Sequence, residues 1–226
     1  PLSMKTFCDG KRLDRYGSVI RSRGTEEDYP PRYIDEIIFS SAESHAVVER
    51  LVTGVSRAPK DQSMGILIFG RTNSGRKTLA SLLPTAIEQC TYGDYDEPGG
   101  QIVIRCKSGK AGQSQLAELQ AQIRRVCFES VSRLRYVTLI DVEELSTDAQ
   151  QDLKSVMNTL NVVFILVTSR ISKIDNGVLD RCSHKVFMSF PDEVQLRPLV
   201  RAMLSAEDDT VAEQASNKIF EIPPKT

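Results

Sequence analysis

A segment bounded by two glycines combines residue types that bind phosphate groups. Residues 70–78 read Gly-Arg-Thr-Asn-Ser-Gly-Arg-Lys-Thr and directly follow a short apolar run, Gly65–Phe69. Glycines at this spacing let backbone N–H groups approach a phosphate, and a cationic side chain after the second glycine reaches its oxygens. The expected chemistry is therefore phosphate binding. The candidate residues are Gly70, Asn73, Ser74, Gly75, Arg76, Lys77 and Thr78.

The segment departs from the pattern G-x-x-x-x-G-K-[ST] at its last two positions. In that pattern the lysine contacts the terminal phosphates and the hydroxyl holds Mg²⁺. Here Arg76 takes the lysine position and Lys77 the hydroxyl position, while Thr78 comes one residue too late. If Lys77 and Thr78 are instead aligned with the Lys and Ser/Thr of the pattern (a shifted frame), the loop contains one residue too many, and its backbone can no longer surround a phosphate in the usual geometry. Arg76 can still contact a phosphate through its planar guanidinium, but Lys77 cannot ligate a metal.

We interpret the segment as a P-loop by ancestry, because a strand precedes it and a helical pattern follows. The alternative is a strand-to-helix turn that needs glycines for its backbone alone. On the first interpretation no cofactor is required, ATP or ADP binds weakly, and no metal is held.

A second motif lies at residues 137–144, Val-Thr-Leu-Ile-Asp-Val-Glu-Glu. A Walker B strand ends in an Asp for the Mg²⁺ shell, and a Glu that polarises the attacking water follows. Asp141 fits the first role, but Val142 stands where the Glu belongs. Successive residues of an extended strand point to opposite faces, so Glu143 and Glu144 do not simply replace it. We predict a buried strand, an acidic surface turn and lost catalysis.

The elements that would position these motifs alternate between strands and helices. Such alternation predicts a three-layer α/β fold with a mostly parallel sheet and right-handed crossovers. Apolar runs predict strands at 65–69, 101–106, 136–142, 162–168 and 185–189. Helical spacing predicts helices within 33–58 and at 79–90, 114–132, 148–160 and, as a short turn, 176–182.

Composition excludes several classes of protein. The 226 residues fit one large domain, and 29 Lys and Arg against 30 Asp and Glu exclude a wholly basic nucleic-acid-binding protein. No apolar run reaches the roughly 18 residues that span a membrane. Five scattered cysteines without C-x-x-C spacing and two histidines predict reduced thiols and no metal site. Any DNA contact must therefore come from a local basic patch.

Two local segments are basic. Residues 5–24 hold six Lys and Arg against two Asp, and 1–32 is expected to be a tag remnant, Pro1–Ser3, followed by a flexible arm without a secretory signal. The stretch 101–135 holds seven Lys and Arg against two Glu. A solvated helix face is the alternative explanation for this second stretch.

The order of further motifs resembles a known family. Residues 148–157 (Asp-Ala-Gln-Gln-Asp-Leu-Lys-Ser-Val-Met), 164–169 (Phe-Ile-Leu-Val-Thr-Ser), 172–174 (Ser-Lys-Ile) and 179–182 (Leu-Asp-Arg-Cys) are similar to clamp-loader AAA+ subunits. Within that family the resemblance is to small replication factor C subunits with a degenerate P-loop and to bacterial delta prime. It covers residues 33–206 and implies an AAA+ P-loop core at 33–189 and the start of a helical lid within 190–226.

The resemblance also implies roles for single residues. Arg181 matches the arginine finger that enters a neighbouring subunit's ATP site, and Ser169 takes the sensor 1 position, where the family usually has Asn. Asp141 is the remnant of Walker B. Asp180 replaces a serine and is expected to pair with Arg181. The residues implied to contact the DNA backbone are Lys107, Lys110, Arg124 and Arg125.

The first hypothesis is therefore a catalytically impaired AAA+ subunit of a clamp-loader-like replication or repair complex. Its partners would be other AAA+ subunits in a hetero-oligomer, with a sliding clamp and DNA backbone, in a nucleus or in a bacterial cytoplasm. A second hypothesis is a divergent ATPase in which Arg76, Asp141 and Glu143 still turn over ATP. A third is a pseudo-ATPase scaffold in origin recognition, checkpoint or chromosome-segregation assemblies.

Overall fold

The computed structural model describes residues 31–54, 63–92, 101–125 and 134–207, without the side chains of 90–92, 125 and 201–207. Residues Tyr33–Phe190 form one compact unit, and the described residues on either side of it belong to a second. The assignment of the flanking segments as an arm and a lid stays a prediction. No helix in the described part of the chain is long and apolar enough to cross a membrane.

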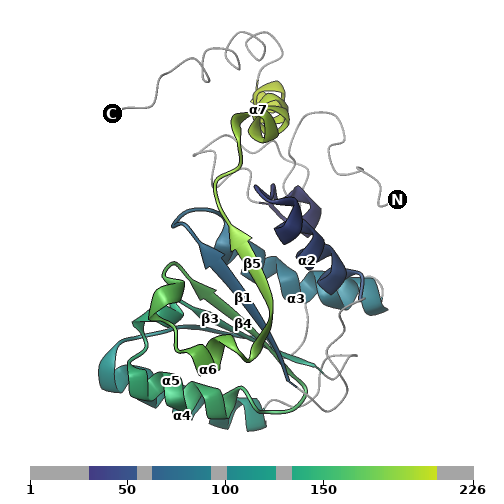
Figure 1. Cartoon of the computed structure of the whole chain (residues 1–226). Helices are drawn as coiled ribbons and strands as arrows, with labels where there is room; N and C mark the ends of the chain where they lie inside the picture. Colours follow the sequence, from purple (N-terminus) through teal and green to yellow (C-terminus); the bar gives the residue numbers. More distant parts are fainter. Residues whose placement is uncertain (1–30, 55–62, 93–100, 126–133, 208–226) are drawn as a thin grey trace, which may run out of the picture. The chain divides into compact units, whose positions relative to one another are not determined.

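Within the described residues, a five-stranded sheet forms the centre of the Tyr33–Phe190 unit (Figure 1). Its order is β2-β3-β4-β1-β5, and every pairing is parallel, so the predicted mostly parallel α/β sheet is confirmed. The strands are β1 (Met64–Gly70), β2 (Gln101–Arg105), β3 (Arg135–Ile140), β4 (Val162–Thr168) and β5 (Cys182–Met188).

Helices cover both faces of the sheet (Figure 1). Helices α2 (Ala42–Val52) and α3 (Arg76–Tyr92) lie on one face, and α4 (Gly109–Arg125), α5 (Thr147–Val156) and α6 (Asn176–Leu179) lie on the other. Short 3₁₀ turns occur at η1 (Ile34–Glu36), η2 (Val142–Glu144) and η3 (Ile171–Lys173).

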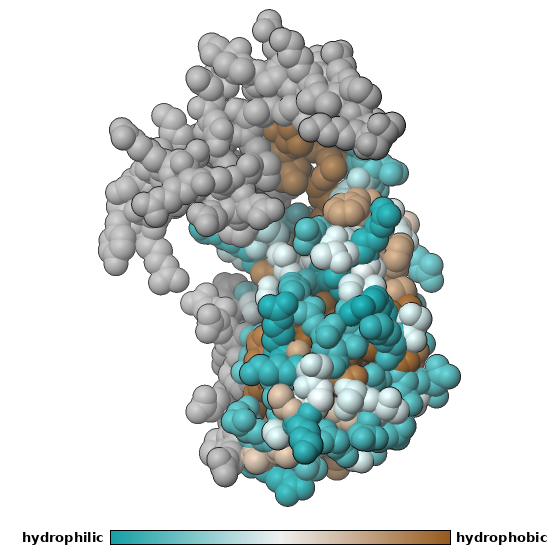
Figure 2. Space-filling model, turned by 90° about the vertical axis from the view of Figure 1, so that its left-hand side faces the viewer, coloured by the Kyte–Doolittle hydropathy of each residue, from teal (hydrophilic) through white to brown (hydrophobic). Residues whose placement is uncertain are grey.

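Two apolar clusters hold the layers together, because alternate strand residues point to opposite faces. On β1, Ile66 and Ile68 pack with α2 and α3, whereas Leu67 packs with α4 and α5. All seven residues of β4 are buried, as expected for the middle strand. On the face drawn in Figure 2, hydrophobic residues gather in one patch at the top, and the surface below it is mostly hydrophilic with smaller hydrophobic spots.

Several predicted boundaries differ from the structure. The helical pattern within 33–58 forms a helix only from Ala42, where the Ser41 hydroxyl caps it by accepting the Ser44 N–H. Helix α3 begins three residues before the predicted Leu79, and α4 begins at Gly109 rather than Ser114. The predicted end of that helix at Ser132 lies outside the described residues. The strand predicted to run to Val142 ends at Ile140, because Asp141 turns left-handed with φ 58°.

Helix α7 (Glu193–Glu207) belongs to the other compact unit and is described by itself. Its first turn contains an i,i+4 ion pair between Glu193 and Arg197. The helix starts where the lid was predicted to begin, and its role as a lid stays a prediction.

Candidate functional site

The glycine-rich loop connects the end of β1 to α3, and three residues in it have positive φ. Gly70 has φ 144°, Asn73 has φ 62° and Gly75 has φ 82°. Asn tolerates the left-handed region through its short polar side chain, whereas the Gly70 conformation is open only to glycine. The Leu79 N–H donates to the Gly75 carbonyl at 2.9 Å, which starts α3 directly after the loop. Arg76, Lys77 and Thr78 therefore form the first turn of the helix.

Arg76 folds back on the loop. Its Nε donates to the Arg71 carbonyl at 3.1 Å, and the Ser74 hydroxyl donates to the same oxygen at 2.7 Å. The Arg76 side chain is 6% exposed, and its Nη1 is buried without a hydrogen-bond partner. Lys77 points elsewhere, so the geometry favours Arg76 over the shifted frame for the role of the loop's phosphate-binding cation.

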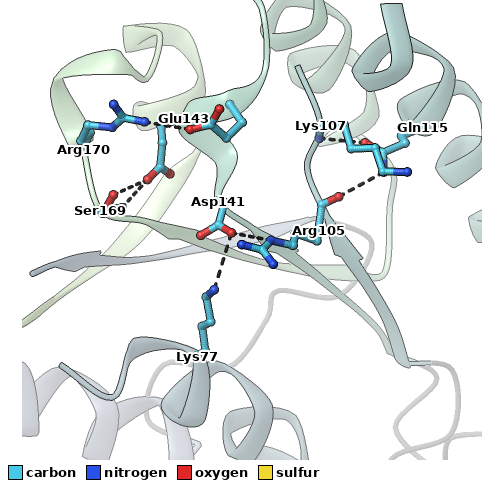
Figure 3. Close-up of polar contacts among 9 residues, drawn as sticks. Lys77, Arg105, Lys107, Gln115, Asp141, Glu143, Ser169 and Arg170 are labelled. Atoms are coloured by element: carbon cyan, nitrogen blue, oxygen red, sulfur yellow. Dashed lines mark hydrogen bonds and ion pairs between the residues drawn. The ribbon is translucent and has the colours of Figure 1, made fainter. Parts of the chain in front are cut away.

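Lys77 contacts Asp141, the residue predicted to be a Walker B remnant. Its Nζ lies 3.5 Å from Asp141 Oδ2, and the Nε of Arg105 lies 2.8 Å from the same oxygen. Figure 3 shows both cations converging on this carboxylate, one from α3 and one from the end of β2. The sequence named Asp141 as a candidate, but it did not single out Arg105 as its partner.

Gln115 fixes the backbone that carries Arg105. Its Nε2 donates to the Arg105 carbonyl at 3.1 Å, and its Oε1 accepts the Lys107 N–H at 2.9 Å (Figure 3). The Cys106 N–H also donates to the Ile140 carbonyl, which ties the end of β2 to the end of β3. Arg105 is thus held beside Asp141 by its strand and by α4.

Glu143 is not part of a surface turn, which corrects the sequence-based prediction. Its side chain is 7% exposed, and Oε1 accepts hydrogen bonds from both the N–H and the hydroxyl of Ser169. Burial alone would raise the pKa of Glu143, but the bonds from Ser169 and the Thr168 hydroxyl outweigh it and lower the pKa from 4.5. Only Glu144 matches the prediction, as a half-exposed partner of Arg170 at 2.8 Å.

Ser169, which is predicted to take the sensor 1 position, therefore contacts an acidic residue, while Asp141 faces the other way. In Figure 3 the Glu143 carboxylate points toward Ser169, and the Asp141 carboxylate points toward Lys77 and Arg105. Val142, at the position of the missing Walker B glutamate, is completely buried. The buried Glu143 Oε2 has no hydrogen-bond partner.

Ser169→Ala should destabilise the fold at neutral pH by about 1–3 kcal/mol, because a buried carboxylate loses a hydroxyl donor. A lowered pKa means that this stabilisation is present above pH 4.5 and is lost as the pH falls through the lower pKa of the folded state. Urea unfolding at several pH values measures it. The difference from wild type should shrink on acidification below pH 4.5, and exposed Ser172→Ala should show neither effect. A pH-independent difference would contradict this explanation.

Arg181 directly precedes β5 and lies at the end of the strands opposite to the glycine-rich loop. Cys182 pairs with Gly65 near the start of β1, whereas Gly70 at the end of β1 pairs with Met188. Five residues of strand separate the two ends, about 16 Å at the usual rise. Arg181 is exposed and thus lies on the surface at the end of the sheet far from its own loop.

The expected ion pair between Asp180 and Arg181 is absent from the described residues. Instead, Arg181 Nε donates to Asn158 Oδ1 at 3.1 Å and Nη1 donates to the Gly177 carbonyl at 2.8 Å. The guanidinium is thus held by a carbonyl of α6 and by the Asn158 side chain rather than by the Asp180 carboxylate. Both partners are neutral, so the Arg181 charge is not cancelled.

Gln150 holds the segment that leads to Arg181. This buried side chain on α5 donates from Nε2 to the carbonyls of Leu145 and Lys173 and accepts the Asp175 N–H at 2.7 Å. Lys154 on the same helix lies 3.2 Å from Asp175 Oδ1 and lowers the pKa of that carboxyl. The sequence contained Gln150 in the family-like segment, but no pattern indicated its function.

Gln150→Ala should lower the free energy of unfolding by about 2–4 kcal/mol, because it leaves two carbonyls and one N–H without their partner. Gln151 is the next residue and is exposed, so Gln151→Ala is the matched control and should change stability by less than about 0.5 kcal/mol. Urea unfolding monitored by circular dichroism measures both. Equal effects of the two changes would exclude the role given to Gln150.

The candidate DNA contacts lie at two places. Lys107 and Lys110 are exposed at the start of α4, and Arg124 is exposed near its end. Fourteen residues of helix separate Lys110 from Arg124, about 21 Å. The Arg125 side chain lies outside the described residues. Contact with DNA by these residues stays a prediction.

The described thiols have no reactive setting. Cys106 and Cys182 are both buried, and burial is the main cause that raises the pKa of each to about 12. Within the described ranges no group of three or more His, Cys, Asp or Glu side chains is placed to hold a metal ion.

Comparisons with known proteins identify the fold and its type. No protein-family model matches the sequence. "Replication factor C small subunit 1" of Pyrobaculum islandicum is 24% identical over 199 residues, which cover 87% of this chain and 56% of that protein. "Replication factor C subunit 4" of Caenorhabditis elegans is 23% identical over 205 residues, 86% of this chain and 57% of that protein. The chain thus spans little more than half the length of these relatives.

Solved structures agree on the architecture. A DNA polymerase III gamma subunit-related protein of Thermotoga maritima superposes with a TM-score of 0.52 at 16% identity, over 76% of this chain and 61% of that one. The RuvB Holliday junction branch migration motor of the same organism gives 0.55 at 13% identity, over 83% and 59%. Together with the five-stranded parallel sheet, these likenesses agree on one kind of fold. In fold and in sequence the chain is similar to AAA+ domains of the clamp-loader type.

Proposed function

We propose that this chain is a subunit of a clamp-loader-like hetero-oligomer in DNA replication that does not itself hydrolyse ATP. The observation that carries this proposal is the contact of Lys77 with Asp141, supported by Arg105 on the same carboxylate oxygen. An ammonium group stands where the Mg²⁺-binding hydroxyl is needed, and Asp141 is already paired with cations. The likeness to replication factor C small subunits supports the replication role.

In this proposal Arg181 acts on a neighbouring subunit. The residue is exposed, lies at the sheet edge away from its own loop, and is held by two neutral acceptors. An arginine presented in this way can stabilise charge on a phosphate transferred in an adjacent ATP site. The other AAA+ subunits would supply catalysis, and the sliding clamp and DNA backbone would be further partners. The complex would act in a nucleus, or in the cytoplasm of a bacterium.

The buried position of Glu143 favours a second candidate function, that of a divergent ATPase. Its buried carboxylate is held at the sensor 1 position with Oε2 unpartnered, as a group that orients a water would be. Against it, Glu143 and Asp141 point in different directions, and Asp141 is already paired with Lys77. The non-hydrolysing subunit therefore agrees better with the geometry.

Affinity purification of the chain from its native cell tests the proposed assembly. The proposal expects AAA+ ATPase subunits to co-purify in a fixed stoichiometry, with further association to DNA that weakens as salt is raised. A stable assembly that contains no other AAA+ ATPase would contradict it and would instead support a scaffold in another chromosome-associated complex.

A further inference from the structure

The divalent cation that AAA+ domains commonly use does not fit the residues of this site. Mg²⁺ requires oxygen ligands in near-octahedral geometry, whereas Lys77 offers only N–H donors. The Lys77 Nζ and the Arg105 Nε both contact Asp141 Oδ2, so a metal at this carboxylate would meet two positive charges.

A phosphate group does fit the same loop. Arg76 is only 6% exposed. Its Nε donates to the Arg71 carbonyl, whereas its Nη1 is buried without a hydrogen-bond partner. An unpaired buried guanidinium is costly, and an anion would relieve that cost. Gly70 and Gly75 give the loop its left-handed turns with positive φ, and the loop leads directly into the N-terminus of α3, whose free backbone N–H groups are donors that suit phosphate oxygens.

The charges around the loop also favour an anion without a metal. Arg76, Lys77 and Arg105 carry three positive charges against the single negative charge of Asp141. Arg76 and Lys77 stand at the positive end of the 17-residue helix α3, whose first turn has no acidic residue. Lys77 is half-exposed, so its ion pair with Asp141 is weak and its ammonium has donors left for a second acceptor.

We propose that the loop binds the diphosphate group of a nucleotide without a divalent cation, with Lys77 supplying, from the protein itself, the positive charge that Mg²⁺ would otherwise bring. Arg76 contacts the phosphate from within the loop, and Arg105 keeps Asp141 neutralised. This binding is additional to the proposed assembly and to the role of Arg181, so its failure would leave those two claims standing.

Isothermal titration with ADP, once with EDTA and once with Mg²⁺, tests the proposal on the purified chain. Wild type should bind with dissociation constants that agree within about threefold in the two buffers, because no metal takes part. Lys77→Thr restores a hydroxyl and removes the ammonium, so its affinity in EDTA should fall about tenfold or more and recover with Mg²⁺. Lys77→Gln removes the charge without restoring the hydroxyl and should weaken binding in both buffers.

The controls separate the proposal from its rivals. Exposed Lys185 on β5 provides the matched variant Lys185→Thr, which should bind as wild type does in both buffers. Inorganic pyrophosphate as a second probe tells whether the diphosphate alone suffices; measurable binding of it in EDTA supports the proposal. Three results would overturn it: no binding of ADP or pyrophosphate at millimolar concentration, binding of ADP only with Mg²⁺, or unchanged binding in EDTA by both Lys77 variants.

Discussion

Arg181→Ala is expected to lower ATP hydrolysis by the assembled complex at the neighbouring subunit's site about 10³-fold or more, the usual effect of removing an arginine finger. The physical reason is the loss of a guanidinium that neutralises charge developing on the transferred phosphate. The change should leave this chain folded, because Arg181 is exposed and its partners are an exposed Asn158 side chain and one helix-terminal carbonyl.

Two matched variants make the Arg181 result specific. Lys185→Ala removes a nearby exposed positive charge from β5 and should leave hydrolysis unchanged. Arg181→Lys keeps the charge but loses the planar fork, so hydrolysis should recover only in part. Steady-state phosphate release by the reconstituted complex measures all three. If Arg181→Ala assembles normally and hydrolyses ATP at the wild-type rate, the finger assignment is wrong.

Gly70→Ala is expected to destabilise the domain by about 3 kcal/mol or more, since it combines backbone strain with overlap of atoms. Gly70 has φ 144°, and a Cβ built there would lie 1.8 Å from the Met188 carbonyl oxygen on β5. The Arg71 N–H donates to that same oxygen, so β5 cannot move away without loss of this contact. The start of the glycine-rich loop is therefore fixed by its neighbouring strand.

Gly109→Ala measures the cost of backbone strain without any overlap of atoms. Gly109 also has positive φ, 63°, but a Cβ there would meet nothing within 4 Å. Its replacement should cost only the backbone strain, about 1–2 kcal/mol. Urea unfolding of both variants gives the comparison, and a smaller loss at Gly70 than at Gly109 would show that β5 does not pack against the loop as described.

The elements of the fold were predictable because their signals are local. Continuous apolar runs such as Val162–Thr168 mark strands buried on both faces, and the glycine loop after β1 marks the strand-to-helix turn. Helix starts were less predictable. Gly109, with its positive φ, precedes the amphipathic part of α4, and the loop's second glycine rather than apolar spacing sets the start of α3.

Residues of the candidate site could be proposed from the sequence only where they belong to a single continuous motif. The loop and Asp141 could be assigned because each follows its own strand directly. The partners could not be assigned, since Arg105 reaches Asp141 only because β2 lies beside β3, and the sequence does not state strand order. The contact of Glu143 with Ser169 depends likewise on β3 lying beside β4 and on the left-handed Asp141, which ends β3 and changes the direction of the next side chains.

Hydrolysis of ATP by the purified chain alone, with saturating ATP and Mg²⁺, tests the central claim most directly. The claim is that Lys77 and Arg105 occupy the carboxylate on which a catalytic metal would depend, so the domain serves other subunits rather than its own catalysis. We expect no phosphate release above that of Asp141→Asn. Magnesium-dependent hydrolysis that Asp141→Asn abolishes would contradict the claim and would identify this chain as an active ATPase.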